Sequence, residues 1–364
     1  MAENVFILGA GASKKAGAPL MGNFLDKSAE LMRFNEVGTP DAFEEIFDLL
    51  ADLRLVYANS HLDLRNIESV FGAIEMGNIL DSLAYKSGEE ITTARNALIT
   101  VIVQTLERSI SYPVDSHGIR APEEYAAFVS ALRSLLPWDK FSIITFNYDI
   151  AIDLALSQEW NQDIDYGLVD DGQRNDRATL LKLHGSVSWP SCQECNRIVP
   201  YYFTPENVTR VLQATTSPAY LKNRTYLLLS SELYTTHKCQ ANQGVNTSVS
   251  GTPLIVPPTW NKKEYHGALT AVWRRAAKEL ADARNIFVIG YSLPESDAFF
   301  RYLFALSTFN NSNIEKFWVY NPDRSGDVER RYRALVGSGI ATRFEYKTEG
   351  YFSNAISDLK QLDI

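Results

Sequence analysis

The chain has 364 residues, of which 45% are hydrophobic and 12% aromatic, and its formal net charge is −9. This length and composition predict a large globular core and exclude a disordered chain. The acidic balance argues against strong nucleic-acid binding by the chain alone. No apolar run approaches the ~20 residues of a membrane-spanning helix, and the N-terminus lacks the pattern of a signal peptide, so we expect a cytoplasmic protein that does not bind membranes.

The first predicted element is a buried strand over residues 5–8, which the segment GAGASK follows directly at residues 9–14. Small residues let the backbone turn tightly and approach a phosphate, and a helix that begins there directs its free N–H groups at an anion. The third glycine of the dinucleotide fingerprint is absent because Lys14 stands in its place, which disfavours an ordinary dehydrogenase. Phosphate binding and a tight structural turn are both open interpretations of this segment.

Residues 26–135 carry apolar side chains at three- and four-residue spacing, for example at Phe43, Ile46, Phe47 and Leu50. This spacing predicts amphipathic helices whose apolar stripes pack against one another or against a partner subunit. Such a long helical insertion is unusual for a plain Rossmann sheet. We therefore expect a separate helical module that covers the ligand cleft or forms an assembly surface.

From about residue 136 the chain alternates between short apolar runs and amphipathic stretches. The predicted strands are 141–146, 178–183, 253–257, 285–290, 316–320 and 341–346. The predicted helices are 148–157, 267–283, 296–308, 326–336 and 352–361. This alternation predicts an α/β fold with a Rossmann-like doubly wound parallel sheet. The expected domain comprises residues 1–25 and 136–364, with a helical insertion at 26–135 and a small irregular insertion at 190–250.

Two further motifs follow predicted strands, namely TFNYD at residues 145–149 and LHGS at residues 183–186. A lone Asn-x-Asp after a strand is usually a turn or a helix cap, and a lone His-Gly is usually a loop histidine. In an open α/β sheet, however, ligands bind beyond the carboxyl ends of the strands, where these motifs and the glycine turn would meet. Asn147, Asp149 and His184 are therefore candidate site residues.

In this order the three motifs resemble those of the sirtuins, which carry Gly-Ala-Gly-x-Ser, then Thr-x-Asn-x-Asp, then His-Gly. The segment at Gly290 to Leu293 and the residue Asn321 are similar to the sirtuin segments near the adenine-side ribose. The details FNYD, KLHGS, GYSLPESD and YNPD resemble bacterial sirtuin-like proteins of anti-phage defence more closely than protein deacylases. The resemblance runs from about residue 4 to about residue 325, although residues 30–130 resemble no known pattern.

The resemblance implies that NAD is the substrate and that Asn147, His184 and Asp149 are catalytic. An amide both donates and accepts hydrogen bonds, so Asn147 can orient a water, and an imidazole takes a proton near neutral pH. Asp149 would fix the nicotinamide amide or its own loop. The expected NAD-binding residues are Gly9, Ala10, Gly11 and Ser13 at the phosphates, with Gly290, Ser292 and Asn321 on the adenosine side.

The leading interpretation is an NAD hydrolase that forms nicotinamide and ADP-ribose and serves as an anti-phage defence effector. One alternative is an NAD-dependent protein deacylase, which needs a peptide channel and usually a complete zinc module. Another is a non-catalytic nucleotide-binding subunit of a defence complex. The resemblance also implies a second component such as a HerA-like ATPase, and the helical module favours a homo-oligomer.

All three cysteines lie in the insertion at 190–250. Cys192 and Cys195 form a CxxC pair eight residues after His184, where a sirtuin places the first half of its structural zinc site. Only Cys239, with His237 two positions before it, is available for the second half. A Cys3His zinc site suits the preference of zinc for thiolate and imidazole, although His-x-Cys is an awkward spacing for one knuckle. The alternative is three reduced cysteines without a metal, as is common in the cytosol.

Overall fold

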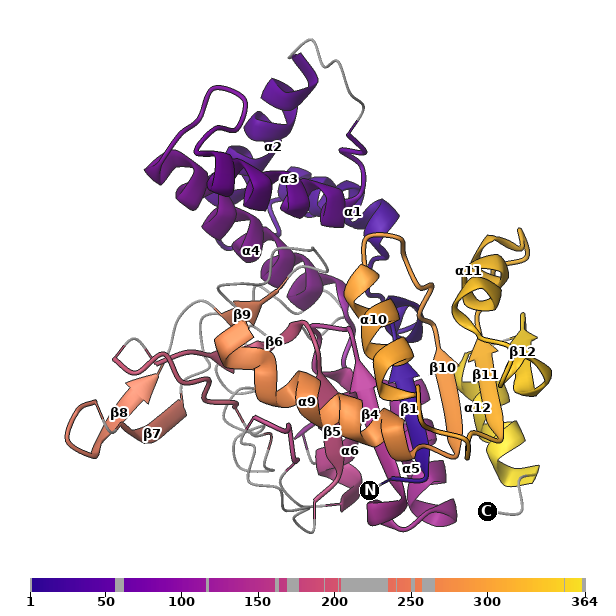
Figure 1. Ribbon diagram of the computed structural model, residues 1–364. Coiled ribbons are helices and arrows are strands. Elements are labelled where there is room, and N and C mark those ends of the chain that lie inside the picture. Colours follow the sequence, from indigo (N-terminus) through magenta and orange to yellow (C-terminus); the bar gives the residue numbers. More distant parts are fainter. Residues whose placement is uncertain are drawn as a thin grey trace.

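The computed structural model describes residues 2–55, 62–115, 118–160, 164–168, 177–192, 194–201, 203, 235–239, 241–249, 253–256, 266–349 and 351–361. Six short runs rich in β-branched and aromatic residues form one sheet (Figure 1). Its strands are β1 (Asn4–Leu8), β4 (Phe141–Thr145), β5 (Thr179–Lys182), β10 (Asn285–Ile289), β11 (Lys316–Tyr320) and β12 (Phe344–Lys347).

Every neighbouring pair of strands in this sheet is parallel, and the spatial order is β12-β11-β10-β1-β4-β5. The chain therefore builds the sheet outward from β1 through β4 and β5, and then crosses β1 to continue outward through β10, β11 and β12. This is the strand order of a doubly wound dinucleotide-binding fold. The predicted fold class, a Rossmann-like α/β sheet, is confirmed.

Helices cover both faces of the sheet, which explains why β1, β4, β5 and β10 are buried throughout (Figure 1). On one face Phe6 of β1 contacts Phe128 with ring centroids 5.4 Å apart, and on the other Phe317 of β11 contacts Phe304 at 5.2 Å. The first face carries α5 (Glu123–Leu135), α6 (Ala151–Trp160) and α12 (Phe352–Gln361), and the second carries α9 (His266–Asp282), α10 (Ala298–Ser307) and α11 (Asp327–Leu335).

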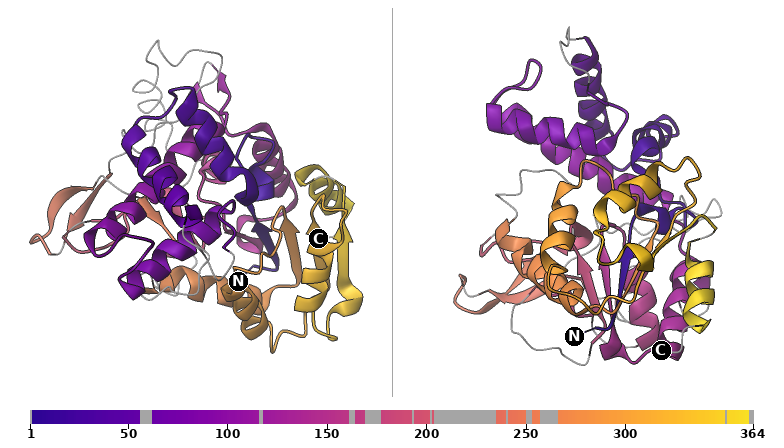
Figure 2. Two further views of the ribbon diagram at one scale, coloured as in Figure 1. Left: turned by 90° about the horizontal axis from the view of Figure 1, so that it is seen from above. Right: turned by 45° about the vertical axis from the view of Figure 1, so that its right-hand side comes forward.

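A module of four helices lies over the carboxyl ends of the strands, at the opposite end of the molecule from the two termini (Figures 1 and 2). It comprises α1 (Phe24–Arg33), α2 (Pro40–Leu55), α3 (Ile67–Leu80) and α4 (Glu89–Ser109). Its apolar stripes face inward, so that Phe43, Ile46 and Leu98 are fully buried. The insertion expected at 26–135 also includes α5, but α5 packs on the sheet, and the four-helix module ends at Ser109.

The remaining elements are short. The 3-10 helices among the described residues are η1 (Ala10–Ser13), η2 (Met21–Asn23), η3 (Trp138–Lys140) and η5 (Ala341–Arg343). Within the described part of the chain, three antiparallel pairs stand apart from the main sheet: β2 (Val114–Asp115) with β3 (Gly118–Ile119), β6 (Gly185–Pro190) with β9 (Pro253–Ile255), and β7 (Thr235–Cys239) with β8 (Val245–Val249). Among the described helices, none is long and apolar enough to cross a membrane.

The structure departs from several predicted elements. The strand expected at 341–346 begins only at Phe344, since Ala341–Arg343 form η5. The strand expected at 253–257 is β9, which pairs antiparallel with β6 outside the main sheet, and residue 257 lies outside the described residues. The glycine turn leads only into η1, because Gly17 has φ +105° and Pro19 follows, so the first α-helix begins at Phe24. Most of the insertion expected at 190–250 lies outside the described residues, apart from short stretches and the β7–β8 hairpin.

A buried ion pair joins the end of β5 to α6. The Lys182 side chain is fully buried, and its ammonium donates to a carboxylate oxygen of Asp153 at 2.8 Å and to the carbonyl oxygen of Asp149 at 2.5 Å. The other carboxylate oxygen of Asp153 accepts from the Tyr166 hydroxyl at 2.8 Å. Both charges are therefore paired and hydrogen-bonded, which is the condition under which buried charges are tolerated.

We predict that Lys182→Met lowers the free energy of unfolding by about 3–5 kcal/mol, because it leaves the Asp153 carboxylate buried without its counter-charge. Urea denaturation at neutral pH measures the change. Lys27→Met is the control, since Lys27 pairs with Glu30 on the surface of α1 and its loss should cost at most about 1 kcal/mol. Equal, small effects of the two substitutions would contradict this account of the ion pair.

Candidate functional site

A cavity of about 460 Å³ lies at the carboxyl ends of five strands, namely β1, β4, β5, β10 and β11. From β1 the chain moves to β4 on one side, and from the neighbouring β10 it moves to β11 on the other side. The cavity therefore occupies the switch point where doubly wound sheets bind their ligands. Seven of the site residues predicted from the sequence line it: Ala10, Gly11, Asn147, His184, Gly290, Ser292 and Asn321. The predicted residues Gly9, Ser13 and Asp149 lie behind this lining.

The glycines of the first turn are required by a close approach to the end of β10. A Cβ atom on Gly9 would lie 2.4 Å from the Tyr291 Cα, and one on Gly11 would lie 2.8 Å from the Gly290 oxygen. The N–H groups of Gly9 and Gly11 donate to the carbonyl oxygens of Ile289 and Gly290 at 3.0 and 2.9 Å. These two N–H groups are thus used within the protein, and it is the surfaces of Ala10, Gly11 and Lys14 that face the cavity.

Asn147 joins the end of β4 to this turn. Its side-chain nitrogen donates to the Gly9 carbonyl oxygen at 3.0 Å and to the Ser13 hydroxyl at 3.1 Å. Among the described residues no hydrogen bond to its side-chain oxygen is found, so Oδ1 is the atom that can accept from a ligand. The residue is 7% exposed and lines the cavity. Asn147 is therefore held rigidly, with its acceptor available.

Ser13 and Asp149 support the cavity from below. The Ser13 hydroxyl donates to Asp149 at 2.7 Å and also lies 2.7 Å from the Tyr125 hydroxyl, while Asp149 accepts from the Ala151 N–H at the start of α6. Burial raises the pKa of Asp149, and the neighbouring Lys182 ammonium opposes that rise. In this arrangement Asp149 acts on the site by holding the loop that carries Asn147.

His184 faces an acidic residue that the sequence motifs did not single out. It lies two residues after β5, is 4% exposed, and its Nε2 atom is 3.7 Å from a carboxylate oxygen of Asp297. Asp297 also accepts a hydrogen bond from the Tyr291 hydroxyl at 2.6 Å and caps the first turn of α10. The only sequence feature that points to Asp297 is its position in GYSLPESD near the start of a predicted helix. An aspartate there is also a common helix cap, so the sequence does not distinguish a functional residue from a structural one.

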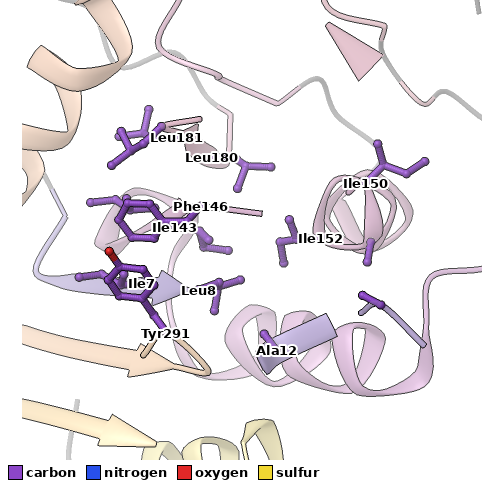
Figure 3. Packing of buried hydrophobic residues seen from close by; sticks show 14 of the residues in the cluster. Ile7, Leu8, Ala12, Ile143, Phe146, Ile150, Ile152, Leu180, Leu181 and Tyr291 are labelled. Carbon is purple, nitrogen blue, oxygen red and sulfur yellow. The ribbon is translucent and has the colours of Figure 1, made fainter. Parts of the chain in front are cut away.

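Aromatic side chains form one wall of the cavity. The rings of Phe146 and Tyr291 are stacked, with centroids 4.1 Å apart and an interplanar angle of 12°. The His184 ring meets Phe146 edge-on at 5.1 Å. Figure 3 shows Phe146 and Tyr291 among the buried side chains at the ends of the strands. This wall fixes the plane of the imidazole.

The residues that the sequence predicts to bind adenosine lie at the ends of β10 and β11. The backbone oxygen of Ser292 accepts from the Arg331 guanidinium at 3.0 Å, and the Asn321 side-chain oxygen accepts from the Asp323 N–H at 3.1 Å. Hydrogen bonds from Ser325 and Val328 lower the pKa of Asp323, which also lines the cavity. This end of the cavity is therefore held by its own loop hydrogen bonds.

The helical module closes part of the cavity, because Asn66 and Glu68 at the start of α3 belong to its lining. The Glu68 carboxylate accepts a hydrogen bond from the Ser296 hydroxyl. Burial, together with the nearby Asp297, raises the pKa of Glu68 to about 7 from its ordinary value of 4.5, although the Ser296 hydrogen bond opposes the rise. The sequence predicted a module that covers the cleft or forms an assembly surface, but no motif indicated which of its residues reach the cavity.

The candidate metal residues Cys192, Cys195, His237 and Cys239 converge, and their ligand atoms all lie within 4.8 Å of one another. The Cys192 and Cys239 sulfurs are 3.9 Å apart, and the Cys195 sulfur is 3.8 Å from His237 Nε2. Zn–S bonds of about 2.3 Å in a tetrahedron place two sulfurs about 3.8 Å apart, whereas a disulfide requires about 2.0 Å. The four side chains therefore fit a zinc ion.

The awkward His-x-Cys spacing has a simple structural solution. His237 and Cys239 lie on β7, where residues two apart point to the same side of the strand. The β7–β8 hairpin thus presents both side chains to the CxxC pair. A hydrogen bond with His237 lowers the pKa of the Cys192 thiol to about 6, which favours the thiolate that a metal binds.

Comparison with known proteins shows the family to which the chain belongs. The family model described as a SIR2-like domain matches residues 142–342, which carry β4, β5, β10 and β11. Among solved structures, the chain is similar to a Sir2 homologue in complex with NAD, at 14% identity over 98% of this chain and 88% of that chain, with a TM-score of 0.42. It is also similar to a Sir2 homologue mutant in complex with ADP-ribose, at 13% identity over 98% and 90%, with a TM-score of 0.43. No curated protein matches the chain.

We predict that the purified protein contains about one zinc per chain, and that Cys192→Ser releases it and lowers the melting temperature, because the free energy of metal binding is also free energy of folding. Elemental analysis and thermal unfolding measure the two effects. Ser191→Ala is the control at the neighbouring position and should retain the metal. Protein without zinc, after purification free of chelators, would contradict the metal site.

Proposed function

Because the chain belongs to the family of SIR2-like domains, we propose that it is an NAD hydrolase that forms nicotinamide and ADP-ribose. The observation that carries the proposal is the convergence of Asn147 and His184 in one cavity at the switch point of the sheet. We assign the NAD diphosphate to the surface of Ala10, Gly11 and Lys14. Ser292 and Asn321 would contact the adenosine, and the nicotinamide ribose would lie near Asn147 and His184.

The reaction breaks the bond between the nicotinamide nitrogen and the ribose carbon. The pyridinium nitrogen takes the electron pair and leaves as neutral nicotinamide, while positive charge develops on the sugar. The water oxygen bonds to that carbon and gives up a proton. His184 can take a proton from the water or from a ribose hydroxyl, and the Asp297 carboxylate at 3.7 Å stabilises the imidazolium that results.

In the same step, Asn147 would orient the water or the nicotinamide carboxamide. Its nitrogen is occupied by Gly9 and Ser13, so its oxygen is the atom that would accept a hydrogen bond from the water or the carboxamide. A group locked in this way loses little further freedom when the substrate binds. The assignment of Asn147 to chemistry is therefore consistent with its rigid position.

We further propose that the reaction depletes NAD during phage infection. The support for this role is the resemblance of FNYD, KLHGS, GYSLPESD and YNPD to sirtuin-like defence proteins. An unregulated NAD hydrolase would harm its own cell, so we expect activity to depend on a homo-oligomer or on a partner such as a HerA-like ATPase. Cells that carry the wild-type gene should lose NAD after infection, whereas cells that carry His184→Ala should not.

We predict that His184→Ala reduces the kcat for nicotinamide release by about 10²–10⁴-fold, which is the usual contribution of a positioned base. The melting temperature and the affinity for NAD should change little. His184→Gln, which keeps most of the volume, should be equally inactive. Chromatography of nicotinamide without any acylated peptide measures the rate and separates hydrolysis from deacylation. Turnover near that of the wild type would remove His184 from the mechanism.

We predict that Asn147→Ala stops nicotinamide release, by about 10²-fold or more, yet leaves NAD binding measurable by calorimetry. The reason is that phosphate and adenosine contacts supply most of the ground-state affinity, whereas Asn147 acts at the reacting ribose. Asn313→Ala, at an exposed position far from the cavity lining, is the control. Loss of binding together with loss of activity would instead mean that Asn147 builds the pocket.

A further inference from the structure

The helical module brings a carboxyl group to the cavity that holds His184. Glu68, in the first turn of α3, lines the cavity and accepts a hydrogen bond from the Ser296 hydroxyl in the loop before α10. The next residue along that loop, Asp297, lies 3.7 Å from His184. The contact between Glu68 and Ser296 therefore links the module to the loop that positions the imidazole.

The surroundings of Glu68 favour proton exchange near neutral pH. The titratable groups that act on it or feel its charge come from two other segments: Tyr148 from the loop after β4, and Tyr291 and Asp297 from the loop between β10 and α10. Lys14 and His184 line the same cavity. Burial and Asp297 together raise the pKa of the Glu68 carboxyl to about 7. A general base works best when its pKa lies near the working pH.

Hydrolysis of NAD can use a second base beside His184. A single imidazole nitrogen cannot hold a ribose hydroxyl and accept the proton of the attacking water at the same time, since each interaction uses the same lone pair. Two titratable groups with different environments in one cavity are the usual way in which proteins divide such tasks. His184 and Glu68 are two such groups.

We propose that Glu68 is a catalytic residue, the base that takes the proton from the attacking water, while His184 serves the ribose hydroxyl. This inference rests on the proposed hydrolysis of NAD. As the water oxygen bonds to the ribose carbon, the electron pair of the breaking bond goes to the nicotinamide nitrogen, and the water proton goes to the Glu68 carboxylate and then to solvent. The helical module therefore completes the active site.

The competing role for Glu68 is structural, because an acidic residue in the first turn stabilises a helix through its dipole. Glu89 fills that role at the start of α4, and there it is exposed to solvent. A dipole interaction does not require the carboxyl to line a cavity beside another acid, as the half-buried Glu68 carboxyl does. Glu89→Gln is thus a matched control, since it makes the same chemical change in the first turn of a neighbouring helix.

The test compares wild type, Glu68→Gln and Glu89→Gln in nicotinamide release between about pH 5 and pH 9. Glu68→Gln should lower kcat by about 10²-fold and make the fall in rate on the acid side of a midpoint near pH 7 less steep, because only the ionisation of His184 then remains. NAD affinity by calorimetry should stay within about threefold of the wild type. Glu89→Gln should match the wild type in every measurement.

A second measurement does not depend on activity. The folded protein binds the Glu68 proton more tightly than the unfolded chain does, so the wild type loses stability as the pH rises from 4.5 to about 7. Glu68→Gln should lack this loss and should gain stability relative to the wild type above pH 7, whereas Glu89→Gln should not.

The possible outcomes distinguish the role of Glu68 from the proposed hydrolysis of NAD. Equal release and equal pH profiles for wild type and Glu68→Gln would overturn the role of Glu68 alone. An unchanged pH dependence of stability in Glu68→Gln would overturn it as well. Wild-type protein that releases no nicotinamide at any pH would overturn the hydrolysis and, with it, this role.

Discussion

The buried Lys182 ammonium is the interaction on which the geometry of the site depends. It binds the backbone of Asp149 and the side chain of Asp153, so it joins the end of β5 to the loop after β4 and to α6. His184 lies two residues beyond Lys182, and Asn147 lies two residues before Asp149. One buried cation therefore fixes both candidate catalytic side chains relative to each other. Because the charge is desolvated and fully paired, any large movement of either loop would be costly.

The glycine turn shows how one segment meets a packing constraint and a binding constraint together. The close contact of residues 9–11 with the end of β10 leaves no space for side chains, and it uses two backbone N–H groups in hydrogen bonds to β10. The same closeness brings the ends of β1 and β10 together at the switch point of the sheet. The structural interpretation of the glycines is thus sufficient to explain them, and binding of a phosphate would use only the surface that remains.

Much of the parallel sheet could be predicted from the sequence, because strands buried on both faces are continuous apolar runs and their ends carried recognisable motifs. The strand β9 could not be assigned correctly, since a short apolar run does not reveal which sheet it joins. Glu68 was missed for a related reason. It comes from an insertion without a recognised motif, and only tertiary packing brings it beside the loop of Asp297. The His-x-Cys pair looked unfavourable for zinc until β7 placed both side chains on one side of a strand.

The central claim is that the cavity at the switch point holds NAD with its nicotinamide ribose between Asn147 and His184. A crystal structure of the His184→Ala variant soaked with NAD tests it most directly, because the variant should bind the dinucleotide without cleaving it. The account predicts intact NAD with its diphosphate against residues 10–14, its adenosine beside Ser292 and Asn321, and its nicotinamide ribose within hydrogen-bond distance of the Asn147 side-chain oxygen. NAD bound outside this cavity, or a cavity that stays empty at saturating NAD, would contradict the account.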